Sequence, residues 1–237
     1  MAGCVLISAL LCSYILFQIS KSRTFQFFGG LTYRVATDHK VVALTFDDAP
    51  TLKTADVLAI LKQKHVVATF YEIGKEIERY PEIAKAVVAA GMEVGNHSYS
   101  HQRFLLTSPS FVQSEVQKTN DLIRSTGYKG DITFRPPNGK KLFSLPWYLH
   151  QHGIQTIMWD VEPDTYLPTN QTEDEQTTFL VGYTVANVRP GSIILLHPFC
   201  DTCGGDRRAI GQIIDDLQSK GYKFVTISQL LASSTQH

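Results

Sequence analysis

The chain has 237 residues, 43% of them hydrophobic, so it can form one domain of ordinary size with a substantial core. Its 22 basic and 22 acidic side chains give no net charge, and the sequence contains no run of basic residues. The composition therefore gives no support for nucleic-acid binding.

The first twenty residues contain no charged side chain, and Lys21 and Arg23 end this apolar run. Such a segment is typical of the apolar part of a signal peptide or of a short membrane anchor, and a buried helix of the domain is the alternative. No Lys or Arg precedes the run, and the basic residues after it favour the opposite orientation under the positive-inside rule. We nevertheless expect residues 1–23 to direct export, leaving the protein secreted or anchored at the cell envelope.

Residues 24–40 are expected to be a linker, and the stretch V-V-A-L-T-F-D-D-A-P at 41–50 is expected to be a buried parallel strand ending in two carboxylates. Further strands are predicted at 66–71, 92–94, 132–134, 154–159, 192–196 and 223–227. Helices are predicted at 54–64, 75–90, 108–125, 145–152, 177–188 and 208–219. Strands and helices alternate about seven times over residues 41–235, which predicts a parallel α/β barrel smaller than the eightfold one.

Polar side chains follow the ends of five predicted strands. They are Asp47, Asp48, His97, His101, Arg135, Asp160, Glu162 and His197. Because the carboxyl ends of barrel strands meet at one rim, we expect these side chains to form one site.

His97 and His101 are four positions apart, which places both imidazoles on one side of a helix or a tight turn. This spacing suits a divalent metal of the zinc type, and two unrelated surface histidines are the alternative. Asp47 or Asp48 could supply a carboxylate ligand. A site with two histidines and one carboxylate keeps open positions, as catalytic metal sites do.

Five motifs occur in order: T-F-D-D-A-P at 45–50, H-S-Y-S-H at 97–101, R-P-P-N-G at 135–139, W-D-V-E-P-D-T-Y at 159–166 and I-L-L-H at 194–197. Over residues 40–232 the chain thereby resembles the polysaccharide deacetylases, carbohydrate esterase family 4, whose catalytic unit is the NodB-homology domain. The resemblance implies a distorted (β/α)7-8 barrel and a metal-dependent hydrolase. Its expected reaction removes N-acetyl groups from N-acetylglucosamine residues of peptidoglycan or a chitin-like polysaccharide.

The resemblance also implies roles for individual residues. Asp48, His97 and His101 would bind the metal, for which zinc is expected and cobalt, nickel and manganese are alternatives. Asp47 would be the general base and Arg135 its partner. His197 would be the general acid, oriented by Glu162 or Asp160.

Four further residues are expected at the substrate: Leu195 around the acetyl methyl group, the backbone N–H of Asn138 at the oxyanion, and Pro137 and Trp159 in the binding site. The chain departs from the family motifs at three positions. Ala49 replaces a glycine, which matters only if the position needs a positive φ. Asn138 replaces an aromatic residue, and Glu162 replaces an aspartate.

Three other functions use the same features: an O-acetyl xylan esterase, a hydrolase of small amides, and a non-catalytic glycan-binding pseudoenzyme. The apolar N-terminus speaks against a cytosolic amide hydrolase, and the pseudoenzyme is disfavoured because every ligand and base position is filled. Cys200 and Cys203 are expected to form a local disulfide in an exported domain. We expect a monomer.

Overall fold

The computed structural model describes residues 2–234. The helices are α1 Ala2–Ser20, α2 Thr54–Lys64, α3 Gly74–Arg79, α4 Pro81–Ala89, α5 Pro109–Ser125, α6 Ser144–Gln151, α7 Glu173–Asn187, α8 Gly204–Ser219 and α9 Ile227–Ala232, with 3-10 turns η1 Pro137–Gly139 and η2 Pro163–Tyr166. The strands are β1 Leu31–Thr32, β2 Val41–Ala49, β3 Thr69–Glu72, β4 Glu93–Asn96, β5 Thr156–Ile157, β6 Ile193–Leu196 and β7 Lys223–Val225.

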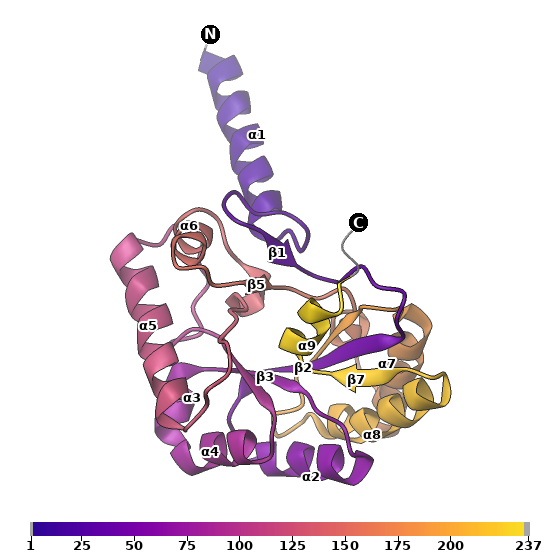
Figure 1. Cartoon of the computed structure of the whole chain (residues 1–237). Helices are drawn as coiled ribbons and strands as arrows, with labels where there is room; N and C mark the ends of the chain where they lie inside the picture. Colours follow the sequence, from indigo (N-terminus) through magenta and orange to yellow (C-terminus); the bar gives the residue numbers. More distant parts are fainter. Residues whose placement is uncertain (1, 235–237) are drawn as a thin grey trace.

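A parallel sheet with β2 at its centre organises the domain (Figure 1). Its order is β4-β3-β2-β6, and β7 pairs with the first residues of β2. A second, two-stranded ladder joins β1 and β5. Single bridges from Phe134 to Asn96 and Thr156, and from Val161 to Ile194, link the two. The fold is therefore α/β and barrel-like as predicted, although the described strands do not close into a complete barrel.

Three predicted elements differ clearly from the structure. The predicted strand 154–159 is shortened to the two residues of β5. The predicted strand 132–134 is reduced to the bridges at Phe134. The predicted helix 75–90 is divided into α3 and α4 at Tyr80, because the proline at position 81 begins a new helix rather than continuing the old one.

Alternate residues of β2 face two different layers, as strand geometry requires. Val42, Leu44 and Phe46 pack in the large apolar cluster that includes side chains of α2 and α8. Ala43 faces the smaller inner cluster, which contains Trp159 and Leu195. Thr45 and Asp47 continue this inner face, so the alternation directs the first carboxylate of the pair into the interior.

The segment 24–40, expected to be a linker, is packed on the domain. The amide of Gln26 donates to the backbone carbonyls of Phe28 and Gly30 and to Thr156 Oγ1. β1 pairs with β5, and the Val35 N–H donates to the Gly191 carbonyl over 2.9 Å. A Cβ at Gly191, whose φ is +80°, would lie 1.8 Å from the Val35 carbonyl oxygen, so this close approach depends on glycine.

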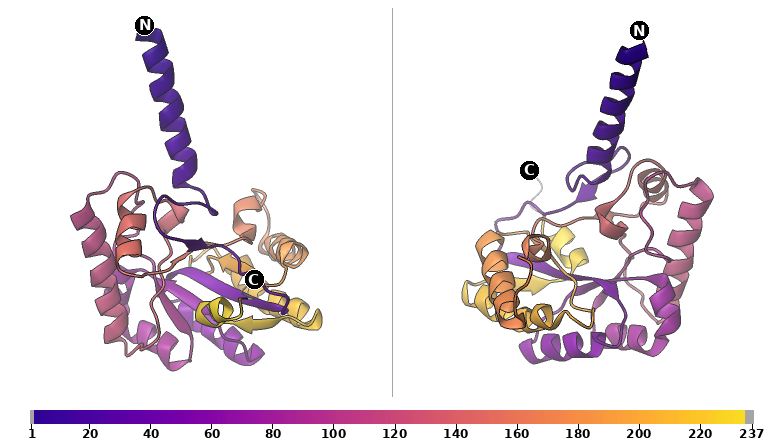
Figure 2. Two further views of the ribbon diagram at one scale, coloured as in Figure 1. Left: turned by 45° about the horizontal axis from the view of Figure 1, so that its top comes forward. Right: turned by 180° about the vertical axis from the view of Figure 1, so that it is seen from behind.

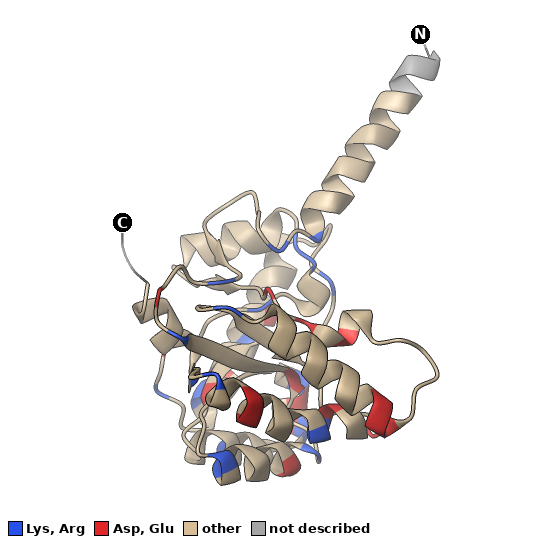
Figure 3. Cartoon of the chain, turned by 90° about the vertical axis from the view of Figure 1, so that its right-hand side faces the viewer, with Lys and Arg blue, Asp and Glu red and all other residues tan. Residues whose placement is uncertain are grey.

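Helix α1 projects away from the domain in every view (Figures 1 and 2). It carries no charged side chain, and basic residues first appear where it joins the domain (Figure 3). That junction is held by Lys141, whose backbone N–H donates to the Ser20 carbonyl and whose Nζ donates to the Ser22 carbonyl. Within the described residues, no helix reaches the length and apolar character needed to span a bilayer.

Candidate active site

The buried end of β2 places Asp47 against Arg135. Nη1 of Arg135 donates to Asp47 Oδ1 and to Thr45 Oγ1, both over 2.8 Å, and Nη2 donates to the Met158 carbonyl. The guanidinium also lies over the Tyr71 ring, 4.1 Å from its centroid. Arg135 is fully buried, so its charge is balanced by this carboxylate rather than by water.

Asp48 leaves the inner face because the backbone is irregular at this residue. The register between β2 and β3 shifts between Asp47 and Ala49, and Asp48 has a φ of +70°. Such a bulge re-aims one side chain without ending the strand. The positive φ falls on Asp48 and not on Ala49, so alanine is tolerated at the motif's glycine position.

A tight turn after β4 brings the two histidines to Asp48. Ser98 and His101 have φ values of +64° and +60°, and the turn is closed by bonds from Ser98 N–H to Asn96 Oδ1 and from His101 N–H to Ser98 Oγ. Asp48 Oδ1 lies 3.2 Å from His101 Nε2 and 3.7 Å from His97 Nε2. The three ligand atoms lie within 4.8 Å of one another, as they would around one cation.

The protonation pattern fits a metal at this point. His97 Nδ1 faces the Arg135 carbonyl at 2.8 Å and must carry the proton there, which leaves Nε2 as a free lone pair. Burial lowers the pKa of His97 and favours its neutral form. Asp48 Oδ1 is buried and has no hydrogen-bond partner within the described part of the chain. These three residues therefore offer unsatisfied ligand atoms to a divalent cation.

The partner of His197 is Asp164. The sequence had predicted Glu162 or Asp160 in this role, and neither contacts His197 in the described structure. His197 Nδ1 donates to Asp164 Oδ2 over 2.9 Å, and the backbone N–H of His197 reaches the same oxygen over 3.2 Å. Burial alone would lower the pKa of His197. The bond to Asp164 and the charges of Asp47 and Asp48 outweigh it and raise the pKa to about 9.

Asp160 and Glu162 have other partners. Asp160 accepts from Ser192 Oγ and from the Ile193 N–H, which fixes the start of β6. Glu162 accepts from Trp159 Nε1 and Thr165 Oγ1 and forms an ion pair with Arg23. The turn η2 explains the difference, because it carries Asp164 back toward His197 while Glu162 faces the segment after α1.

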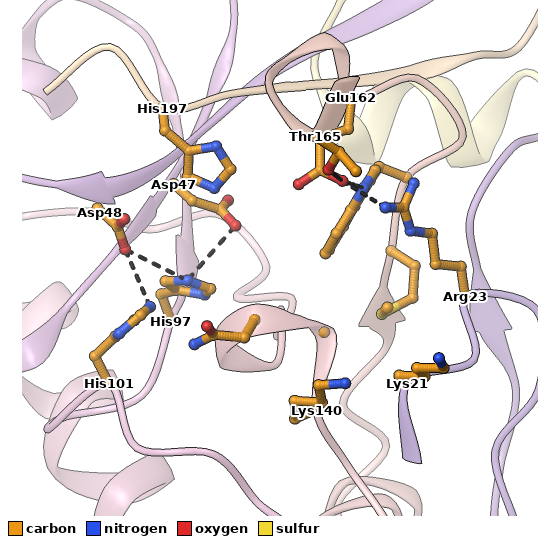
Figure 4. A pocket seen from close by; sticks show the side chains of 14 residues that line it. Lys21, Arg23, Asp47, Asp48, His97, His101, Lys140, Glu162, Thr165 and His197 are labelled. Carbon is orange, nitrogen blue, oxygen red and sulfur yellow. Dashed lines mark hydrogen bonds and ion pairs between the residues drawn. The ribbon is translucent and has the colours of Figure 1, made fainter. Parts of the chain in front are cut away.

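The two aspartates of β2, the two histidines of the turn after β4 and His197 line one cleft of about 600 Å³ (Figure 4). Its lining residues are Lys21, Arg23, Asp47, Asp48, His97, His101, Asn138, Gly139, Lys140, Met158, Trp159, Glu162, Thr165 and His197. Trp159 and Asn138 thus lie where the sequence places substrate contacts, and Asn138 adopts the left-handed conformation (φ +54°) that asparagine tolerates.

Leu195 and Pro137 are buried and do not line the cleft as the structure describes it. Leu195 packs in the inner cluster with Trp159, so it supports the wall from behind. The contact of Leu195 with the acetyl methyl group stays a prediction.

Sequence reasoning missed four residues of the site. Asp164 had a signal, since it is the third acid of the W-D-V-E-P-D stretch. Lys21, Arg23 and Lys140 had none, and the first two lie in the segment 1–23 that was assigned to export.

The loop after His197 is closed by a disulfide between Cys200 and Cys203, as expected. Phe199 of this loop packs with Phe46 and Phe70 of the large apolar cluster. The disulfide and these rings together hold the loop that follows β6.

Residues 34–157, more than half of the chain, match the family model described as polysaccharide deacetylase. The chain belongs to the polysaccharide deacetylase family. It is 33% identical over 214 residues to a peptidoglycan-N-acetylglucosamine deacetylase of Bacillus cereus, covering 86% of this chain and 93% of that protein.

Solved structures agree with this assignment. The Bc1960 peptidoglycan N-acetylglucosamine deacetylase has a TM-score of 0.76 at 28% identity, covering 86% of this chain and 94% of the other. BA3943 of Bacillus anthracis, described as a family pseudoenzyme, has a TM-score of 0.75 at 30% identity, with 86% and 69% covered. Because the family contains a pseudoenzyme, activity in this chain depends on which of its own residues occupy the site.

Metal binding tests the ligand set directly. We expect His97→Ala or His101→Ala to abolish stoichiometric binding of Zn²⁺, because two remaining ligands make a weak, open site. Calorimetric titration of metal-free protein measures this. His39→Ala, which alters an exposed histidine outside the cleft, should bind like the unaltered protein. Full zinc binding by either ligand variant would show that the metal lies elsewhere.

Proposed function

We propose that this polysaccharide deacetylase removes N-acetyl groups from N-acetylglucosamine residues of peptidoglycan, outside the cytoplasm and with zinc as its metal. One observation carries the proposal. A buried base, three free ligand atoms and a histidine paired with a carboxylate all face a single cleft (Figure 4). The named activity of the Bacillus cereus relative supports the choice of polymer.

Two imidazoles and one carboxylate form a donor set that zinc favours. A divalent cation held there would polarise the acetamido carbonyl and lower the pKa of the attacking water. Asp47 is placed to accept the proton of that water, since Arg135 fixes its Oδ1 by a hydrogen bond and its Oδ2 lies 3.5 Å from His97 Nε2. The Asn138 N–H is proposed to stabilise the oxyanion from the opposite wall.

His197 is proposed to give its proton to the departing nitrogen. The hydrogen bond to Asp164 raises the pKa of His197 and favours its protonated form, so the acid is ready before the C–N bond breaks. An amide needs this proton because an amine anion is a very poor leaving group. An ester needs it far less, so the paired histidine favours amide over ester hydrolysis.

Acetate release from N-acetylated peptidoglycan strands tests both the reaction and the two aspartates. We expect Asp47→Asn to bind zinc normally but to lose at least about 100-fold in kcat, as expected for loss of a general base. Asp48→Asn should instead lose zinc affinity and recover part of its rate in excess zinc. The reverse pattern would show that Asp48 is the base and Asp47 the metal ligand. Acetate release from acetylated xylan but not from peptidoglycan would show that the protein is an esterase and not a deacetylase.

The pH dependence of the rate tests the His197–Asp164 pair. The acid is active below its pKa, so removing the carboxylate in Asp164→Asn lowers that pKa and should move the basic limb of the pH–rate profile to lower pH. Glu162→Gln and Asp160→Asn are matched controls whose basic limb should not move. An unchanged limb in Asp164→Asn would remove His197 from the acid role.

Export is proposed from two features, the apolar α1 and the Cys200–Cys203 disulfide, which suits an oxidising compartment. Fractionation of cells that express the full chain, combined with N-terminal sequencing, measures this. We expect the protein in the envelope or the medium. A wholly cytoplasmic protein with an intact N-terminus would contradict the proposal.

A further inference from the structure

Three cations line the cleft, and among the residues that the structure describes two of them have no carboxylate as a counter-ion. Arg23 is paired with Glu162. Lys21 and Lys140 line the same cleft, and in the described part of the chain neither forms an ion pair with a carboxylate. Figure 4 shows them across the cleft from Asp48 and His101.

The two lysines share one aromatic contact. Their Nζ atoms lie over the same ring, that of Phe17, at 5.2 Å for Lys21 and 4.9 Å for Lys140. Partial burial together with the charges of Lys21 and Arg103 lowers the pKa of Lys140. Like charges gathered without a partner repel one another, so an anion bound between them would be stabilised.

Lys21 is part of the wall because the chain after α1 is fixed in place. The Nζ of Lys141, a residue only 1% exposed, donates to the Ser22 carbonyl over 2.6 Å. Two positions from Lys21, Arg23 stacks over Trp159 with its guanidinium 4.8 Å from the ring centroid and pairs with Glu162. The segment that carries Lys21 is therefore fixed against the domain, and its side chain is a regular part of the cleft wall.

We propose that Lys21 and Lys140 bind a carboxylate carried by the glycan beside the sugar whose acetamido group lies at Asp47 and His97. This inference rests on the proposed function and narrows it to acidic N-acetylated glycans. A neutral chitin-like chain has no group for these two charges. The carboxylate could belong to a sugar substituent or to an attached peptide, and both present the same chemistry to the lysines.

Binding to an inactive full-length protein tests the inference. Asp47→Asn is titrated calorimetrically with peptide-free peptidoglycan strands bearing free sugar carboxylates, and with the same strands after conversion of those carboxylates to amides. Two screened charge contacts should make the acidic strand bind about tenfold tighter. This gap should narrow at high salt. Strands that retain their peptides form a third arm, and a gap confined to that arm assigns the carboxylate to the peptide.

Adding Lys21→Gln and Lys140→Gln to Asp47→Asn should abolish the difference in affinity between the acidic and the amidated strands, which is the gap that the other variants test. Lys140→Arg keeps the charge and should preserve it. Lys62→Gln alters an exposed lysine of α2 outside the cleft and should also preserve it. Zinc binding by each variant reports that it is folded, and Lys140→Gln alone should narrow the gap if the double variant is unfolded.

Equal binding of the acidic and amidated strands, with and without peptides, would overturn the inference, as would a gap that survives both substitutions. Acetate release by the unaltered protein distinguishes failure of the carboxylate site from failure of the proposed deacetylation. Release without a binding gap removes only the carboxylate site. A binding gap without release from any glycan removes the proposed deacetylation and keeps the anion site.

Discussion

The buried pair of Arg135 and Asp47 is the interaction on which the interior of this domain depends. Arg135 has no access to water, and breaking a buried ion pair by removal of one partner typically costs about 3–5 kcal/mol. Its guanidinium connects β2, through Thr45 and Asp47, with the chain at Met158. The same bonds that allow a charge inside the fold therefore also hold the base in one orientation.

The two neighbouring aspartates lie in different environments because the backbone directs their side chains to different places. A regular strand would already send Asp47 and Asp48 to opposite faces. The positive φ at Asp48 turns its carboxylate toward the two imidazoles at the rim. One carboxylate thus sits in a dry, ion-paired setting and the other at the mouth of the cleft, which suits a base and a ligand respectively.

The residues that chemistry places at strand ends could be predicted from the sequence: Asp47, Asp48, His97, His101, Arg135 and His197 all reach the expected rim. The partner of His197 could not be settled by counting from Trp159, because the turn η2 changes which acid faces inward. The packing of 24–40 was also hidden. Its bonds, such as that between Gln26 and Thr156, join residues 130 positions apart and leave no local pattern.

The contact between Arg23 and Glu162 joins the segment after α1 to the rest of the domain. Glu162 occupies a position that the family motif gives to a shorter acid, and only 11% of its side chain is exposed. A truncated or chimaeric chain that starts at residue 24 would keep this glutamate and discard its cation. The natural boundary for transplanting the catalytic unit is therefore the end of α1 at Ser20, because Arg23 then stays with Glu162. An exchange that extends as far as residue 23 has to supply a matching cation at that position.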